Sequence, residues 1–153
     1  MTDASGEHGL VADVHVPGSG TRFAGAGGDS MLLRLATASG DPITVVEDTS
    51  SDSEPAPLHS HPWDELVYVL EGEMSLTCGN VTRVGGPGTL ATLPRGIAHT
   101  LHVTAPPARF LMITIGAPSA AFLAEMGNAY AEGPTLERLL EVARRHGVEP
   151  RWE

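Results

Sequence analysis

The stretch "PLHSHPWDELVYVLEGE", residues 57–73, places two histidines just before an alternating apolar run. In a β-strand, side chains two positions apart point to the same side, so His59 and His61 share a face. A regular continuation adds Glu65 and two valines to that face, although Pro62 can bend or bulge the segment. Two imidazoles and a carboxylate are therefore predicted on the inner face of a strand.

A second stretch, "GTLATLPRGIAHTLHV" at residues 88–103, supplies another imidazole. After its Pro-Arg-Gly turn, His99 alternates inward with Leu101 and Val103, while His102 points outward. Three imidazoles and a carboxylate inside an apolar barrel would lack partners, at a cost of roughly 1–3 kcal/mol per group. A divalent metal resolves that conflict. An isolated His-x-His pair also occurs on solvated strand faces, so the metal interpretation depends on both stretches together.

Short apolar or alternating runs continue on both sides of these stretches, bounded by Gly, Pro, Asp, Asn or Ser. They predict an all-β fold, an antiparallel sandwich or barrel, with strands near residues 31–37, 42–48, 65–72, 73–78, 81–85, 88–94, 99–104 and 109–115. Gly79 and Asn80 tolerate positive φ, which predicts a tight hairpin turn at "CGNV". The last run has apolar residues on both faces, and we expect part of it to line an apolar pocket suited to a planar or aromatic ligand.

The periodicity becomes helical after the last strand. Residues 119–131 and 135–147 are predicted helices, the second with Thr135 as its cap and an apolar stripe formed by Leu136, Leu139, Leu140 and Ala143. The start of the chain is rich in glycine and small polar residues, which predicts coil with one short strand near residues 11–16. We expect no internal repeat and no second core.

These patterns predict three parts along the chain. They are a loose N-terminal segment (1–30), the β-barrel (31–116), and a C-terminal helical extension packed on the barrel (117–153).

The composition restricts the partners and the compartment. The chain has 153 residues, a net charge of -10 and no lysine, so nucleic acids and anionic membranes are poor partners. No apolar run approaches the ~20 residues of a membrane span, and the first residues do not form a secretory signal. Cys78 is the single cysteine, which fits a reducing compartment. We expect a cytoplasmic protein with a small-molecule substrate, no nucleic acid and no membrane.

Together, the two histidine stretches resemble the paired motifs of the cupin superfamily. The order of a strand barrel followed by "GAPSAAFLAEMG" and a last helix also resembles its small, single-domain, quercetin-dioxygenase-like members. The first motif matches at His59, His61, Glu65 and Gly72, and the second at Gly88, Pro94, Gly96 and His99. Ser53 and Val103 depart from the family pattern, at positions that are not ligands in it. The resemblance implies a jelly-roll barrel with short C-terminal helices. It also implies one divalent metal (iron, zinc, manganese, nickel, cobalt or copper) on His59, His61, Glu65 and His99.

Four protein ligands leave positions open on a metal that takes five or six, which favours catalysis over a structural role. The resemblance implies an enzyme for a small aromatic, enol-containing or polyketide-like substrate. Its chemistry is either dioxygenase-like or the non-redox Lewis-acid chemistry of a cyclase or isomerase, with Glu65 as catalytic base. A small-molecule-binding or sensor protein without turnover is the alternative, and a structural interaction protein is a third. Because open sheet edges tend to be paired or covered, we expect a homodimer.

Overall fold

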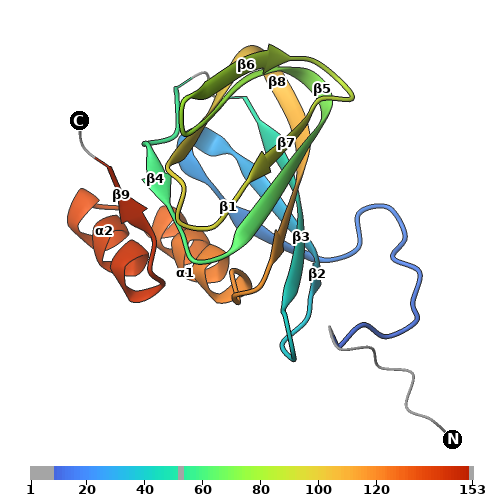
Figure 1. The fold of residues 1–153 in the computed structure, drawn as a ribbon. Helices are drawn as coiled ribbons and strands as arrows, with labels where there is room; N and C mark the ends of the chain where they lie inside the picture. The colour runs from blue at the N-terminus through green and yellow to red at the C-terminus, as the bar shows by residue number, and fades with distance from the viewer. Residues whose placement is uncertain (1–8, 52–53, 152–153) are drawn as a thin grey trace, which may run out of the picture.

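A computed structural model describes residues 9–51 and 54–151 of the chain. Within these residues, nine strands form one antiparallel sheet that curls into a barrel, with two helices beside it (Figure 1). The strands are β1 (Thr21–Ala24), β2 (Ser30–Ala36), β3 (Ile43–Ser50), β4 (His59–Ser60), β5 (Asp64–Cys78), β6 (Val81–Gly85), β7 (Leu90–Leu93), β8 (His99–Ile115) and β9 (Glu149–Pro150), and a short 3₁₀ turn lies at Ala26–Gly28. The predicted all-β cupin architecture with short C-terminal helices is thus confirmed.

Two long strands join the two layers of the barrel. The first half of β8 pairs with the second half of β5, and the second half of β8 pairs with the first half of β5 and with β3. Each long strand contains two runs that the sequence predicts as separate strands. In β5, Gly72 explains why the two predicted strands are continuous. Its φ is 79°, and the register between β5 and β8 shifts on both sides of it, so the strand bends here without ending. A Cβ at this position would lie 2.6 Å from the Pro107 carbonyl oxygen, so only glycine fits.

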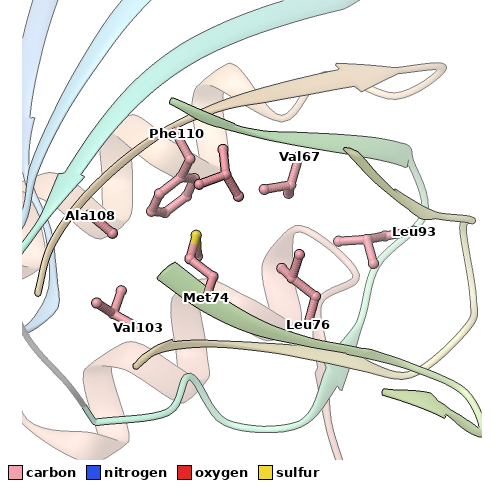
Figure 2. Packing of buried hydrophobic residues seen from close by; sticks show 8 residues of the cluster. Val67, Met74, Leu76, Leu93, Val103, Ala108 and Phe110 are labelled. Carbon is pink, nitrogen blue, oxygen red and sulfur yellow. The ribbon is translucent and has the colours of Figure 1, made fainter. Parts of the chain in front are cut away.

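Side chains from both layers meet inside the barrel and form its main core. Figure 2 shows Phe110 and Val67 facing Met74 and Leu76 across the interior. The full cluster of buried residues is Val67, Val69, Met74, Leu76, Leu93, Val103, Ala108 and Phe110. The alternation predicted from residue 65 onward is present, since Val67 and Val69 are fully buried while Tyr68 between them is 41% exposed.

The two predicted helices are present as α1 (Ala120–Ala131) and α2 (Leu136–Arg145). Thr135 caps α2, because its side-chain oxygen accepts a hydrogen bond from the Arg138 backbone N–H. Contrary to expectation, a second small cluster exists: Ala143 and Val148 pack on Trp63 outside the main core. Among the described residues, neither helix has the length and apolar character needed to cross a membrane.

The structure departs from the sequence expectation near both termini. The strand expected at residues 11–16 is absent, and its valines project into solvent, because no neighbouring strand pairs with this segment. The first strand is β1 instead, which pairs with β2. β9, which the sequence did not predict, pairs with β4. Residues 1–8 of the expected loose segment lie outside the described residues, and the three-part division of the chain stays a prediction.

The turn at "CGNV" connects β5 to β6 as predicted, with Cys78 paired to Val81. Gly79 takes a φ of 55°, but no residue other than glycine has positive φ in the described chain, so Asn80 keeps a negative value. Positive φ at only the first central position is a feature of type II′ turns, which match the twist of a hairpin.

Candidate metal centre

Three imidazoles lie together where β4 meets β8. His59 and His99 are directly paired across the two strands, and His61 follows β4. The ring centroid of His99 lies 4.5 Å from that of His59 and 4.6 Å from that of His61. One ring nitrogen from each histidine falls within 4.8 Å of the other two, a spacing at which three ligands can hold one metal ion. The structure therefore brings together the three histidines singled out in the sequence.

Each of these imidazoles is oriented by a backbone carbonyl. The Nδ1 atoms of His59, His61 and His99 lie 2.6, 2.9 and 2.9 Å from the carbonyl oxygens of Pro57, Trp63 and Ile97 respectively. A carbonyl oxygen only accepts, so each Nδ1 carries a proton, and in the neutral ring Nε2 then has a lone pair. Metal-binding histidines commonly have this second interaction, which fixes the tautomer and the direction of the ring.

Glu65 extends the cluster with a buried carboxylate. Its Oε2 lies 2.8 Å from His61 Nε2, and the side chain is 7% exposed. Because His61 already donates through Nδ1, the two atoms would face each other with lone pairs unless a proton or a cation lies between them. His99 Nε2 is buried without a hydrogen-bond partner among the described residues. The three imidazoles can hold a divalent metal, while Glu65 contacts this cluster through His61 and is not one of the atoms that lie within 4.8 Å of one another.

Burial favours the neutral form of two of the imidazoles. Burial first, and the nearby His59 second, lower the pKa of His99 to about 4. Burial also lowers the pKa of His59, against an opposing effect of its hydrogen bond to Pro57. Neutral imidazoles are the form that binds metal, so these two ligands need not release a proton at pH 7.

The other residues considered from the sequence lie outside this cluster. Trp63, expected to pack, is 3% exposed and stacks on His61 with ring centroids 4.5 Å apart. His102, expected to point outward, is half-buried, and its inward neighbours Leu101 and Val103 belong to the core face. Cys78 is half-buried, and burial raises the pKa of its thiol.

Two cavities lie on this side of the molecule, one inside the barrel and one lined by His59. The first, which we call the barrel pocket, has a volume of about 250 Å³ and is lined by Asp48, Met74, Leu101, Val103, Phe110 and Met112, among others. The second, which we call the helix groove, has a volume of about 200 Å³, and its lining includes His59, Phe122, Met126, Leu139, Leu140 and Val148. The predicted apolar stripe of α2 thus faces a groove beside His59, which explains why Leu136 is 65% exposed.

Sequence reasoning missed Asp48, which is 6% exposed and lies in the barrel pocket. The signal was available: Thr44, Val46 and Asp48 alternate along β3, and the first two are 1% exposed. An acidic residue near the end of a strand usually faces solvent, so alternation alone did not single it out.

Comparison with known proteins agrees with this geometry. Residues 51–114 match the Cupin domain family, and this segment contains all three imidazoles and Glu65. The chain carries a cupin domain. No curated protein matches the chain in sequence.

Several solved structures resemble the cupin domain and its surroundings. KdgF from Halomonas sp. has a TM-score of 0.64 at 14% identity, over 72% of this chain and 99% of that one. The polyketide cyclase RemF from Streptomyces resistomycificus has a TM-score of 0.56 at 24% identity, over 85% and 99%. An RmlC-like cupin from Shewanella frigidimarina has a TM-score of 0.54 at 18% identity, over 65% and 86%. At these identities the likeness establishes the shared cupin fold.

Proposed function

We propose that this cupin is a metal-dependent enzyme in which His59, His61, Glu65 and His99 hold one divalent ion. The observation that carries the proposal is the set of buried imidazoles whose Nδ1 atoms contact backbone carbonyls, leaving the Nε2 lone pairs for a cation. When bound, such an ion supplies Lewis-acid chemistry, polarising a carbonyl or enol oxygen of the substrate. Imidazole and carboxylate suit iron, zinc, manganese, nickel, cobalt and copper, so the donor set leaves the choice of metal open.

The proposed substrate is a small aromatic, enol-containing or polyketide-like compound that enters the barrel pocket. Leu101 and Met112 line this pocket, and the next inward-facing residues on the same strand are His99 and Thr114. Thr114 is paired with Glu65 across β5 and β8. The pocket therefore ends one row of side chains from the donor cluster, and its apolar walls exclude water from a planar ligand.

Glu65 is the proposed catalytic base. It is the carboxylate nearest to the imidazoles and is held in β5 opposite Thr114, so its position is fixed by the sheet. A carboxylate there can accept a proton from a substrate hydroxyl or from an activated carbon and return it later in the reaction. The surrounding burial removes water that would otherwise compete for that proton.

The experiment that tests this function offers a phenolic or polyketide-like substrate to the metal-loaded protein with and without dioxygen. Strict dependence on dioxygen would identify dioxygenase-like chemistry, and equal anaerobic turnover would identify a cyclase or isomerase. Saturable binding without turnover under both conditions would identify the alternative, a small-molecule-binding or sensor cupin. Elemental analysis of the purified protein complements the assay, because zinc favours Lewis-acid chemistry and iron, copper or nickel favour oxygenation.

Replacing the proposed base gives the sharper test. Glu65→Gln keeps the size of the side chain but cannot take up a proton as a carboxylate does, so we expect the loss of at least about 100-fold in kcat with the fold retained. His102→Ala, on the opposite face of β8, is the matched control and should keep its turnover. Full activity in Glu65→Gln would remove Glu65 from the mechanism.

The same proposal includes a cytoplasmic homodimer. Strand β6 pairs only with β5 among the described residues, and Val81 and Val84 on it are 54% and 59% exposed. An unpaired edge with exposed valines is a surface that a second copy can cover. Light scattering at micromolar concentration checks this assembly, and a clean monomer mass would contradict it.

A further inference from the structure

The barrel pocket has a polar end that the metal-dependent reaction does not use. Its walls are apolar near Met74, Val103 and Phe110, and Figure 2 shows Phe110 on the side of the interior opposite Met74 and Val103. Asp48 lies in the same row of the sheet as Phe110, since the two are paired across β3 and β8. The pocket is therefore apolar along its length and ends at a carboxyl group.

Asp48 is almost completely enclosed without a protein partner for one of its oxygens. The residue is 6% exposed, and its Oδ1 is buried with no hydrogen bond from any residue in the described part of the chain. An unsatisfied buried polar atom costs roughly 1–3 kcal/mol, so such atoms normally have a function. Because Asp48 lines the cavity, a ligand in the pocket contacts this side chain and can hydrogen-bond to its carboxyl group after a small rotation of that group.

The surroundings of Asp48 define which ligand group fits there. Burial raises the pKa of Asp48 to about 7, and Asp29 contributes to the same shift, so both the acid and the carboxylate are present at neutral pH. Asp29 and Glu54 also line the pocket, and no basic side chain of the described residues does. A phosphate or carboxylate would face three acidic groups, and its binding at this end is disfavoured.

We propose that Asp48 is a specificity-determining residue that binds a hydroxyl group on the end of the substrate remote from the imidazoles. The inference rests on the proposed function, in which the barrel pocket is the substrate site. A hydroxyl fits both forms of Asp48, because it donates to the carboxylate and can also accept from the protonated acid. The substrate class is thereby narrowed to an uncharged, largely apolar ring compound with oxygen functions at both ends.

The dimensions of the sheet agree with a ligand that contacts both ends. Asp48 is paired with Phe110 and Glu65 with Thr114. These two partners are four residues apart on β8, and this spacing separates the rows of the sheet in which the two carboxyl groups lie. At a rise of about 3.3 Å per residue, that separation is roughly 13 Å between the two rows, before the side chains extend into the space. Such a span suits two or three fused rings.

The test compares two ligands of the same ring system, one of which has a methyl ether in place of a hydroxyl donor. Calorimetry on the full-length, metal-loaded protein measures Kd for naphthalene-2,6-diol and for 6-methoxy-2-naphthol, whose methoxy group cannot donate. We expect the wild-type protein to prefer the diol by about tenfold, the size of one hydrogen bond to a buried carboxyl. The preference should vanish in Asp48→Leu and persist in Asp48→Asn, whose amide oxygen still accepts from a hydroxyl.

A matched control separates recognition from a general effect on the fold. Thr44 lies on the same face of β3, is 1% exposed and has an unpartnered Oγ1, but does not line the barrel pocket. Thr44→Val should therefore keep the preference for the diol. A purely structural role of Asp48 would weaken both ligands equally and leave their ratio unchanged, which would overturn the inference.

Other outcomes are equally decisive. Equal affinities in the wild-type protein, a preference that survives in Asp48→Leu, or no binding of either ligand at millimolar concentration would each contradict the proposal. Metal content and turnover, measured on the same preparations, report separately on the proposed function. A protein that lacks metal but keeps the Asp48-dependent ratio would refute the enzyme while supporting Asp48 as the recognition group.

Discussion

The polar groups at the two ends of the barrel interior are oriented differently, although each end has a buried atom without a hydrogen-bond partner among the described residues, His99 Nε2 and Asp48 Oδ1. At the imidazole end, every Nδ1 has a backbone carbonyl as partner, so the ring directions are set by the main chain. At the acidic end, Asp48 Oδ1 has no partner among the described residues. A group fixed by the backbone is suited to a ligand with strict geometry, such as a metal ion. A buried group left open is suited to a ligand that brings its own hydrogen atom.

The largest expected effect concerns the imidazole end. His99→Ala removes the most deeply buried of the three nitrogen donors, and we expect stoichiometric binding of a divalent metal to be abolished. Elemental analysis after dialysis measures the metal content directly. His102→Ala changes an imidazole three residues along the same strand and should retain full metal content. A His99→Ala protein that still holds one metal per chain would show that His99 is not a required ligand.

A smaller effect is expected at the acidic end, in the dependence of stability on pH. The folded-state pKa of Asp48, about 7, lies above its ordinary value of 3.8, so the folded protein retains a proton that the unfolded chain has lost. The contribution of Asp48 to the free energy of unfolding is therefore full below about pH 4 and is lost as the pH rises through 7, by up to about 4 kcal/mol. Asp48→Asn should lack this decrease. Parallel stability curves of the two proteins between pH 4 and 8, measured by urea unfolding, would contradict the assignment.

The smallest expected effect has the opposite sign and belongs to the metal-free imidazole end. The pKa of His99 falls from 6.5 to about 4 on folding, so the unfolded chain takes up a proton first as the pH decreases. The stability contributed by this residue is present above pH 6.5 and is lost as the pH falls toward 4, by up to about 3 kcal/mol. His99→Gln should show a shallower loss in the same urea experiment, performed with a chelator. If the free energy of unfolding fell equally steeply with pH in the variant and the wild-type protein, His99 would be exposed to solvent before the protein unfolds.

The sequence was most informative where alternation within one strand decides the outcome. The inward direction of His99 and the shared face of Glu65 and Val67 follow from a period of two, and the structure confirms their burial despite Pro62. The pairing of β9 with β4 could not be read in this way, because it joins segments about ninety residues apart and each contributes only two residues. Such short ladders have no local periodicity, and their partners are selected by the whole fold.

Asp48 shows a second limit of sequence reasoning. Its face was available from Thr44 and Val46, but its pocket is also lined by Ala26, Asp29 and Tyr130, which come from other parts of the chain. The alternation along a strand predicts to which face a side chain points. It does not predict which other segments of the chain surround that side chain.

The β4–β9 ladder ties the position of His59 to the far end of the chain. Pro150 is the register partner of His59, and the Arg151 backbone N–H donates to the Leu58 carbonyl at 2.7 Å. Residues 149–151 therefore hold in place the strand that carries one of the three imidazoles. We expect proteolytic removal of this segment, or a bulky affinity tag placed directly after it, to break the pairing of β9 with β4 and thereby to make the position of His59 less fixed.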